Sequence, residues 1–253
     1  MIFFYAGANF FPELIVECGV ENVLLSYFYL KDEEDPFSWW KEMGIKKIFL
    51  DSGGFTARSK GLTIDVKDYG RFIKKHKKDL FCYANLDVQN TEATQSNQRC
   101  LEGQGLNPLP VFHYDEFRNN KELLFEYTAK HNYIAVGGIA GTYTSFNKLK
   151  FFLDFVFAHT KDKVKVHGFG ISGQRLLKRY PFYSADSTSW LQGGKYGAVR
   201  EFDGRKLTDT PEPKKRLVSS KGYKAVNKRS LQEFIKHEQF INKLWKIRGV
   251  KWN

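Results

Sequence analysis

The sequence predicts an α/β protein built as a closed (β/α)8 TIM barrel, followed by a short basic extension. Two observations lead to this prediction. Short apolar runs alternate with helix-compatible segments roughly every 25 residues, and eight such units fit between residues 1 and 190. Parallel strands need crossover connections, so strands that alternate with helices indicate a parallel sheet. Eight repeats match a closed barrel better than the alternative, an open doubly wound sheet.

Each strand is expected where a short run of mostly apolar residues occurs. In chain order these runs are Ile2–Ala6, Val23–Tyr27, Lys47–Leu50, Leu80–Leu86, Leu109–His113, Tyr133–Val136, Lys163–His167 and Phe182–Ala185. The intervening segments carry helix signals. Pro12 and Pro36 suit a first helical turn. The expected N-caps are Asp65, Thr91, Ser145 and Ser172. Gly19 and Gly44 suit helix ends. Apolar residues at helical spacing from Phe146 to Phe157 predict a helix with a core-facing side.

The composition is that of a soluble protein with a substantial core. Of the 253 residues, 42% are hydrophobic and 16% aromatic. No stretch reaches the roughly 18 apolar residues that span a bilayer, and Glu13 and Glu17 interrupt the first apolar run, which argues against a signal peptide. We therefore expect no membrane partner and a cytoplasmic location. The cysteines Cys18, Cys82 and Cys100 are odd in number and widely spaced, so we expect reduced thiols and no metal.

Residues 191–253 are expected to form a basic extension that packs on a catalytic barrel of residues 1–190. Asp203-Gly204 predicts a hairpin turn, and Ser230-Leu-Gln-Glu233 predicts a capping box that opens the last helix. Residues 205–253 hold 14 Lys and Arg against 4 Asp and Glu, so most of the chain's net charge of +12 lies there. Such a patch indicates a polyanion partner, normally nucleic acid. The residues expected to bind it are Lys214, Lys215, Arg216, Lys221, Lys224, Lys228 and Arg229.

Polar residues and glycines follow six of the predicted strands where each strand ends. In strand order they are Asp51, Asp87, His113, Gly137-Gly138, His167 and Asp186. The carboxyl ends of barrel strands meet at one mouth, so we expect these residues to converge there. Three carboxylates and two imidazoles suit general acid–base chemistry with a nucleophilic carboxylate.

These residues also have simpler interpretations. Asp51 could cap a turn, Asp87 could cap the next helix, and Asp186 could be a structural hydrogen-bond hub. Gly137-Gly138 could bind phosphate through backbone N–H groups, as in a barrel that metabolises phosphosugars. The shared placement at strand ends favours a catalytic site.

Two motifs resemble those of the guanine transglycosylase family. They are Asp51-Ser-Gly-Gly-Phe55 and Val136-Gly-Gly-Ile-Ala140, and a strand-end aspartate follows them. In that family such motifs and an aspartate nucleophile line a barrel mouth. The segments His167-Gly-Phe-Gly-Ile-Ser172 and Tyr183-Ser-Ala-Asp-Ser-Thr-Ser-Trp190 look most like its phage branch, which places 7-deazaguanines in DNA. The resemblance covers about residues 45–190.

The resemblance implies a role for each matching residue. Asp186 would be the nucleophile on C1′ of the target nucleoside, and Asp51 the general acid/base. Asp87 would accept hydrogen bonds from the N1–H and 2-amino edge of guanine. Further implied contacts to the purine are Ser52, Phe55, His113, Gly137, Gly138, His167 and Trp190. Phe55 and Trp190 would be candidates for stacking on a base.

The implied activity is exchange of guanine in DNA for a free 7-deazaguanine of the preQ0 or preQ1 type, without a cofactor. The covalent intermediate would be a glycosyl-aspartate, and the modified DNA of a phage would resist restriction in the host cytoplasm. The tRNA enzymes carry a zinc subdomain that this chain lacks, and Ser187-Thr-Ser-Trp190 replaces their Pro- and Arg-containing flank. Both departures favour DNA over tRNA. A target base inside a duplex must be flipped out, so a helper protein that opens DNA would be a further partner. The alternatives are a tRNA-guanine transglycosylase and a noncatalytic nucleic-acid-binding barrel.

Overall fold

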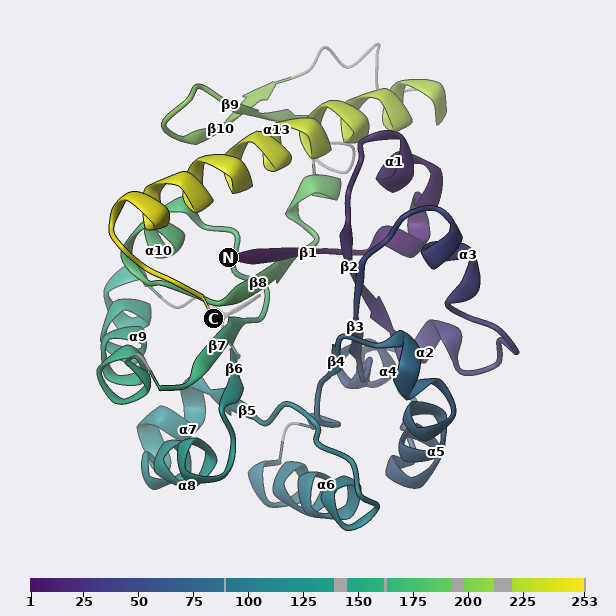
Figure 1. The fold of residues 1–253 in the computed structure, drawn as a ribbon, viewed down its shortest axis with the longest axis vertical. Coiled ribbons are helices and arrows are strands. Elements are labelled where there is room, and N and C mark those ends of the chain that lie inside the picture. The colour runs from purple at the N-terminus through teal and green to yellow at the C-terminus, as the bar shows by residue number, and fades with distance from the viewer. Residues whose placement is uncertain (89, 139–144, 162, 193–197, 212–219, 253) are drawn as a thin grey trace.

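The computed structural model describes the chain apart from residues 89, 139–144, 162, 193–197, 212–219 and 253. The fold is α/β, and its centre is one curled sheet of eight parallel strands in the order β4-β3-β2-β1-β8-β7-β6-β5. Helices surround this sheet in chain order, as Figure 1 shows. The strands are β1 (Ile2–Ala6), β2 (Asn22–Ser26), β3 (Lys47–Asp51), β4 (Cys82–Tyr83), β5 (Val111–His113), β6 (Tyr133–Gly137), β7 (Lys165–Gly168) and β8 (Ser184–Ser187). All eight lie within or next to the predicted runs.

The two edges of the sheet approach each other without forming a ladder. In the described part of the chain, one isolated parallel bridge joins Ala84, just after β4, to Leu109, just before β5. The Leu109 N–H donates to the Tyr83 carbonyl at 2.8 Å, and the Asn85 N–H donates to the Leu109 carbonyl at 3.0 Å. The sheet is therefore curled nearly onto itself and is compatible with a TIM-like barrel.

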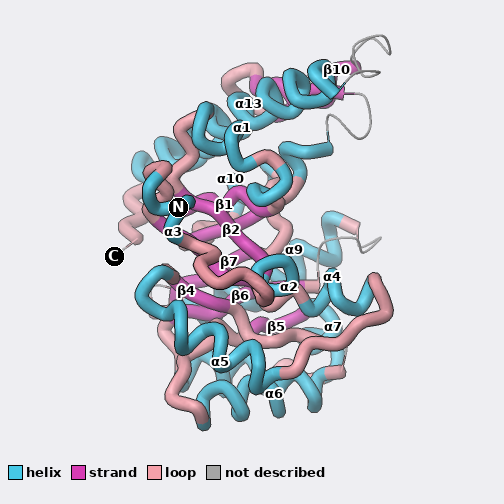
Figure 2. Tube along the Cα trace, turned by 90° about the vertical axis from the view of Figure 1, so that its right-hand side faces the viewer, coloured by secondary structure: helices cyan, strands magenta, loops and turns pink. Residues whose placement is uncertain are grey.

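The helices that follow the strands cover the outside of the sheet (Figure 2). They are η1 (Ala8–Phe10), α1 (Pro12–Glu17), α2 (Tyr27–Leu30), α3 (Ser38–Glu42), α4 (Gly54–Ser59), α5 (Val66–His76), η2 (Lys77–Asp79), α6 (Thr91–Gly103), α7 (Tyr114–Asn119), α8 (Glu122–Lys130), α9 (Phe146–Thr160), α10 (Gln174–Arg179) and η3 (Ser189–Leu191). Pro12 opens α1 as predicted, and Asp65 and Ser145 cap α5 and α9 with their side chains. Two predicted caps are wrong by one position, because Asn90 caps α6 and Gly173 precedes α10.

Side chains alternate between two hydrophobic clusters along the strands. In β1, Phe3 and Tyr5 pack under the helices, whereas Phe4 and Ala6 point into the curled sheet. The inner cluster consists of Phe4, Ala6, Leu24, Phe49, Ala84, Leu109, Val111 and Ala135. This alternation is the period of two that a β-strand imposes, so every second residue of a strand faces the interior of the sheet.

The last helix, α13 (Ser220–Ile247), belongs to the helical layer of the main body (Figure 1). Phe234 packs against Phe3 of β1 at 6.5 Å between ring centroids, and Trp245 donates its indole N–H to the Leu177 carbonyl of α10 at 2.8 Å. Tyr5 donates its hydroxyl to Glu238 at 2.9 Å. The hairpin of β9 (Ala198–Phe202) and β10 (Leu207–Pro211) is bonded to the main body as well, because the Leu207 N–H donates to the Gln174 side chain of α10 at 3.1 Å.

The predicted capping box at Ser230 is wrong. Helix α13 begins at Ser220, ten residues earlier, and Ser230 is fully buried within it. Glu233 instead accepts the backbone N–H of Phe202 from β9 at 3.0 Å. Ser230 does not start the helix because the turn before it also packs into the core, where Val226 and Asn227 are buried.

No helix in the described ranges is both long and apolar enough to cross a bilayer.

Candidate active site

Strand geometry places several of the predicted residues on the inner face of the sheet. Phe49, Val111 and Ala135 belong to the inner cluster. A residue two positions further along a strand points the same way. By this rule Asp51, His113 and Gly137 share the inner face at the carboxyl ends of β3, β5 and β6, and Asp186 follows buried Ser184 on β8. These ends form one rim of the sheet.

Two glycines allow the chain after Asp51 to turn closely past its neighbours. Gly53 has φ of 76°, and a Cβ there would lie 2.5 Å from both the Ser26 Oγ and the Phe28 Cβ. A Cβ on Gly54 would lie 2.4 Å from the Asp87 carbonyl oxygen. These approaches exclude any side chain, so the Ser-Gly-Gly sequence brings the ends of β2, β3 and β4 together. The Gly53 N–H then donates to Asp51 Oδ2 at 3.0 Å.

Asp51 is a half-buried carboxyl group with a strongly shifted pKa. Burial raises the pKa of Asp51 from its ordinary 3.8 to about 6, against the opposing hydrogen bond from the Gly53 N–H. The charges of Asp186 and Asp87 raise this pKa further. The structure therefore brings Asp51 into electrostatic range of the other two predicted carboxylates, Asp87 and Asp186. A carboxyl group with this pKa can both give and take a proton near neutral pH.

Asp186 is nearly buried, with 7% of its surface exposed, and it is held by two donors. The Gly170 N–H donates to Asp186 Oδ1 at 3.0 Å, and His167 Nε2 lies 3.2 Å from the same oxygen. His167 is fully buried, and its Nδ1 lies 2.7 Å from the Ser184 Oγ. Burial lowers the pKa of His167 despite the hydrogen bond to Asp186, so the imidazole is neutral at pH 7. His167 contacts Asp186 from within the core, where it has no surface for a purine.

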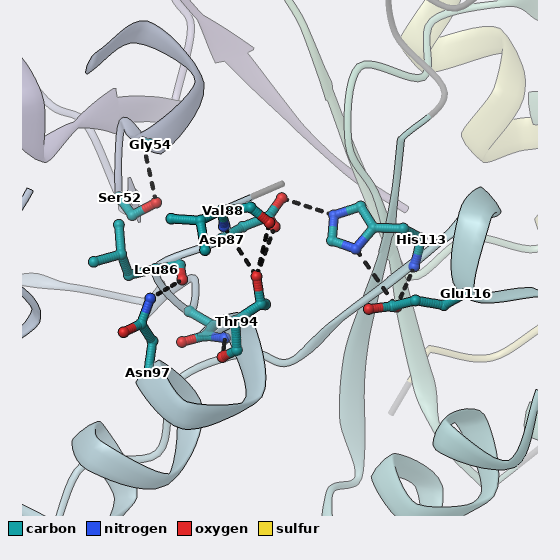
Figure 3. A network of polar contacts seen from close by, with 10 residues as sticks. Ser52, Gly54, Leu86, Asp87, Val88, Thr94, Asn97, His113 and Glu116 are labelled. Atoms are coloured by element: carbon teal, nitrogen blue, oxygen red, sulfur yellow. Dashed lines mark hydrogen bonds and ion pairs between the residues drawn. The ribbon is translucent and has the colours of Figure 1, made fainter. Parts of the chain in front are cut away.

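Asp87 and His113 lie against each other after β4 and at the end of β5, the two edge strands of the sheet (Figure 3). His113 Nε2 lies 2.7 Å from Asp87 Oδ2, and the His113 backbone N–H donates to Glu116 Oε2 at 2.8 Å. Burial alone would lower the pKa of His113, but the hydrogen bonds to Asp87 and Glu116 outweigh it and raise this pKa to about 10. His113 is therefore an imidazolium at neutral pH. The side chain of Asp87 stays 39% exposed and can accept further hydrogen bonds.

The two glycines after β6 differ in what they permit. A Cβ on Gly137 would lie 2.9 Å from the Val111 Cγ1 and 3.1 Å from the His113 ring, so only glycine leaves room for that imidazole. Gly138 is exposed and has φ of 69°. The rest of the motif, Ile139 and Ala140, lies outside the described residues.

The predicted purine contacts Ser52, Phe55 and Trp190 have different surroundings. Ser52 is buried, and its Oγ accepts the Gly54 N–H at 3.4 Å. Phe55 is 74% exposed, with the guanidinium of Arg58 over its ring at 5.5 Å. Trp190 is fully buried and donates its indole N–H to the Ala6 carbonyl at 2.9 Å. Phe55 can stack on a base, whereas the ring of Trp190 has no free face.

More exposed aromatic rings follow β1 and β2 at this rim. Phe10 after β1 is 55% exposed and lies 5.7 Å from Tyr29 of α2, which is itself 38% exposed. The ammonium of Lys60, at the end of α4, lies 5.0 Å from the Phe28 ring and 5.4 Å from the Tyr29 ring. Rings interleaved with cations are typical of surfaces that bind single-stranded nucleic acid.

The basic residues predicted to bind nucleic acid are only partly described. Lys214, Lys215 and Arg216 lie outside the described residues, as does the side chain of Lys221. Lys224 is exposed on α13. Lys228 pairs with Glu17 at 2.9 Å, and Arg229 pairs with Glu201. Part of the positive charge of this helix is therefore balanced by acidic residues of the same chain.

Sequence reasoning missed several residues that shape the site. Glu116, which fixes His113, lies three residues after it and could have been found as the partner of a capping box. Ser184 lies two residues before Asp186, so strand alternation alone puts it on the same face. Tyr133, whose hydroxyl lies 2.5 Å from the Ser184 Oγ, gave no local signal, because this contact joins β6 to β8.

Within the described ranges, no three His, Cys, Asp or Glu side chains gather where they could hold a metal ion. The chain matches no protein-family model and no curated protein sequence.

Proposed function

We propose that this protein is a glycosyltransferase that exchanges guanine in DNA for a 7-deazaguanine base through a covalent glycosyl-aspartate. The observation that carries this proposal is the contrast between Asp51 and Asp186. Burial and neighbouring charge raise the pKa of Asp51 to about 6, while two donors hold one oxygen of Asp186. Two nearby carboxyl groups in different environments can divide acid/base and nucleophilic roles. The Asp51-Ser-Gly-Gly-Phe55 resemblance supports the choice of reaction.

The reaction would proceed in two balanced steps. In the first, Asp186 attacks C1′ as the bond from C1′ to guanine N9 breaks, and protonated Asp51 gives its proton to the departing base. In the second, ionised Asp51 takes the N9 proton of the incoming base. The freed N9 attacks C1′ and releases Asp186, so the exchange consumes no net proton. This sequence parallels the covalent route of retaining glycosidases, and a pKa of about 6 suits both halves.

The pair of Asp87 and His113 would recognise the base. Asp87 is exposed enough to accept hydrogen bonds from the N1–H and 2-amino group of a guanine-like edge. The raised pKa of His113 places a positive charge 2.7 Å from Asp87 Oδ2. A carboxylate next to a fixed cation accepts strong, charge-assisted hydrogen bonds, so a purine without the 2-amino group would bind less well.

The curled sheet would act as a (β/α)8 barrel that closes at the bridge from Ala84 to Leu109, with its mouth at the rim of Asp51, Asp87 and Asp186. The exposed rings of Phe55 and Tyr29 lie on this rim, next to Arg58 and Lys60. They would stack on unpaired bases, which supports a flipped or single-stranded target.

A base-exchange assay tests the proposal. Duplex DNA, single-stranded DNA and tRNA are each incubated with the protein and radiolabelled guanine or preQ0, and incorporated label is measured. We expect label in DNA, none with Asp186→Ala, and strongly reduced label with Asp51→Ala. Asp68→Ala, an exposed carboxylate on α5, is the matched control and should retain activity.

Three other results of this assay would change the proposal. Absence of incorporation into every polymer would refute the proposed activity. Label in tRNA alone would identify the substrate as tRNA instead. Incorporation that survives Asp186→Ala would refute the assignment of the nucleophile.

A further inference from the structure

A line of polar side chains runs through the otherwise apolar interior of the sheet. It starts at Asp186 near the rim and passes through His167 and Ser184 to Tyr133. The distances are 3.2 Å from Asp186 Oδ1 to His167 Nε2, 2.7 Å from His167 Nδ1 to the Ser184 Oγ, and 2.5 Å from this Oγ to the Tyr133 Oη. The residues belong to the adjacent strands β8, β7 and β6. Polar groups in a core are costly unless hydrogen-bonded, and each of these is.

Asp186, His167 and Ser184 are the residue types of a hydrolase triad, but a substrate cannot reach this serine. Ser184 and His167 are both fully buried. Three phenylalanine rings surround the imidazole, with centroid distances of 6.2 Å to Phe4, 4.7 Å to Phe49 and 4.5 Å to Phe169. No substrate carbonyl can reach the Ser184 hydroxyl, so Ser184 is not a nucleophile in this structure. Its effect must pass through His167.

The proton positions along the line follow from its two ends. Burial raises the pKa of Tyr133 well above its ordinary value, so its hydroxyl keeps a proton that it is able to donate to the Ser184 Oγ. The Ser184 hydroxyl is then free to donate to His167 Nδ1. A neutral imidazole carries one proton, which therefore sits on Nε2 and points to Asp186 Oδ1. If His167 Nδ1 instead carried the proton and donated to the Ser184 Oγ, Nε2 would present its lone pair to Asp186 Oδ1. Two acceptors would then face each other whenever Asp186 is ionised.

We propose that His167 is a positioning residue for Asp186, held as the Nε2–H tautomer by Ser184 and Tyr133. The His167 and Gly170 donors both engage Oδ1, and no donor in the described part of the chain reaches Oδ2. Oδ2 is thereby left as the oxygen that attacks C1′. The nucleophilic role rests on the proposed function, whereas the tautomer and the orientation of the carboxylate do not.

Ser184→Ala should cause a specific defect in turnover. Loss of the Ser184 hydroxyl removes the donor to His167 Nδ1 and leaves Asp186 alone to favour the Nε2–H form. The Nδ1–H form, which presents a lone pair to Asp186, should then become more populated. A wrongly set histidine tautomer lowers turnover strongly in serine proteases, so we expect kcat for base exchange to fall at least about tenfold. KM for the free base should stay unchanged, because Ser184 is fully buried and offers no surface to a base. Tyr133→Phe should give a smaller defect of the same kind.

Nitrogen-15 NMR of histidine-labelled protein tests the tautomer without reference to activity. The His167 signals, assigned by comparison with His167→Gln, should report Nε2–H in the unmodified protein. In Ser184→Ala the same signals should move toward a mixture of tautomers. Ser187→Ala, a buried serine of the same strand that bonds Ser189, is the matched control and should leave the His167 signals in place.

The two claims fail separately. An Nδ1–H or doubly protonated His167 would refute the positioning role, as would a Ser184→Ala protein with unchanged kcat. If Ser184→Ala does not fold, as judged by circular dichroism, Tyr133→Phe supplies both measurements. A protein could show an Nε2–H signal that depends on Ser184 and yet exchange no base. That result would refute the proposed function and the nucleophilic role of Asp186, while the orientation of its carboxylate by His167 would still hold.

Discussion

Replacement of Asp51 by Asn should make the protein more stable at neutral pH. The pKa of Asp51 is raised by burial, and by the charges of Asp186 and Asp87, to about 6 from an ordinary 3.8. A carboxyl group with a raised pKa binds more protons in the folded than in the unfolded state. The wild-type protein therefore loses stability as the pH rises from about 3.8 through 6. Asn keeps an oxygen for the Gly53 N–H and carries no charge.

The expected gain depends on pH in a defined way. A difference of about two pH units at 1.36 kcal/mol each corresponds to about 3 kcal/mol in the free energy of unfolding when Asp51 is fully ionised, at pH 8. At pH 5 the folded protein still holds most of this proton, and the gain falls to about 1.5 kcal/mol. For a chain of this size, about 3 kcal/mol raises Tm by roughly 6–12 °C.

Urea unfolding of both proteins at pH 5 and pH 8 measures these values. Asp65→Asn is the control, because backbone hydrogen bonds lower the pKa of this exposed N-cap, so its replacement should not stabilise the protein. An Asp51→Asn protein that is less stable than wild type at pH 8, or whose gain does not grow between pH 5 and pH 8, would refute the electrostatic reasoning. Such a gain together with lost base exchange would show that this carboxylate is kept for function rather than stability.

Three further predictions concern other parts of the molecule. Gly54→Ala places a Cβ 2.4 Å from the Asp87 carbonyl and should cost about 1–3 kcal/mol in urea unfolding, whereas Gly103→Ala, with no atom within 4 Å, should cost nothing; equal costs would refute the packing argument. Burial raises the pKa of Glu238 to about 7 from 4.5, so wild-type stability should fall as the pH rises through this range, and Glu238→Gln should flatten that part of the unfolding curve; an unchanged curve would contradict it. Phe55→Ala should weaken single-stranded DNA binding by about 1–3 kcal/mol in a fluorescence titration. Phe151→Ala on α9, where the ring is 66% exposed against 74% for Phe55, should leave binding unchanged, and equal losses would remove Phe55 from the contact surface.

Local chemistry determined much of the fold. The alternation of apolar runs with helix signals located all eight strands, because a strand repeats every two residues and a helix every 3.6. Asp65 and Ser145 cap helices through hydrogen bonds that span only two or three residues, so the sequence window contains the whole interaction. Their positions at the ends of two predicted parallel strands led us to expect Asp51 and Asp186 at one rim.

Tertiary structure decided how accessible the residues are and which partners they have. Trp190 and His167 follow or end a strand just as the exposed candidates do, yet both are fully buried by contacts with residues far away in the chain. Lys228 belongs to a basic run but pairs with Glu17, which lies 211 residues earlier. Sequence alone determined which chemical groups this protein carries and toward which end of each strand they lie. Only the packing of distant segments decided which groups face solvent and which pKa values shift, because desolvation and charge pairing depend on distance in space rather than along the chain.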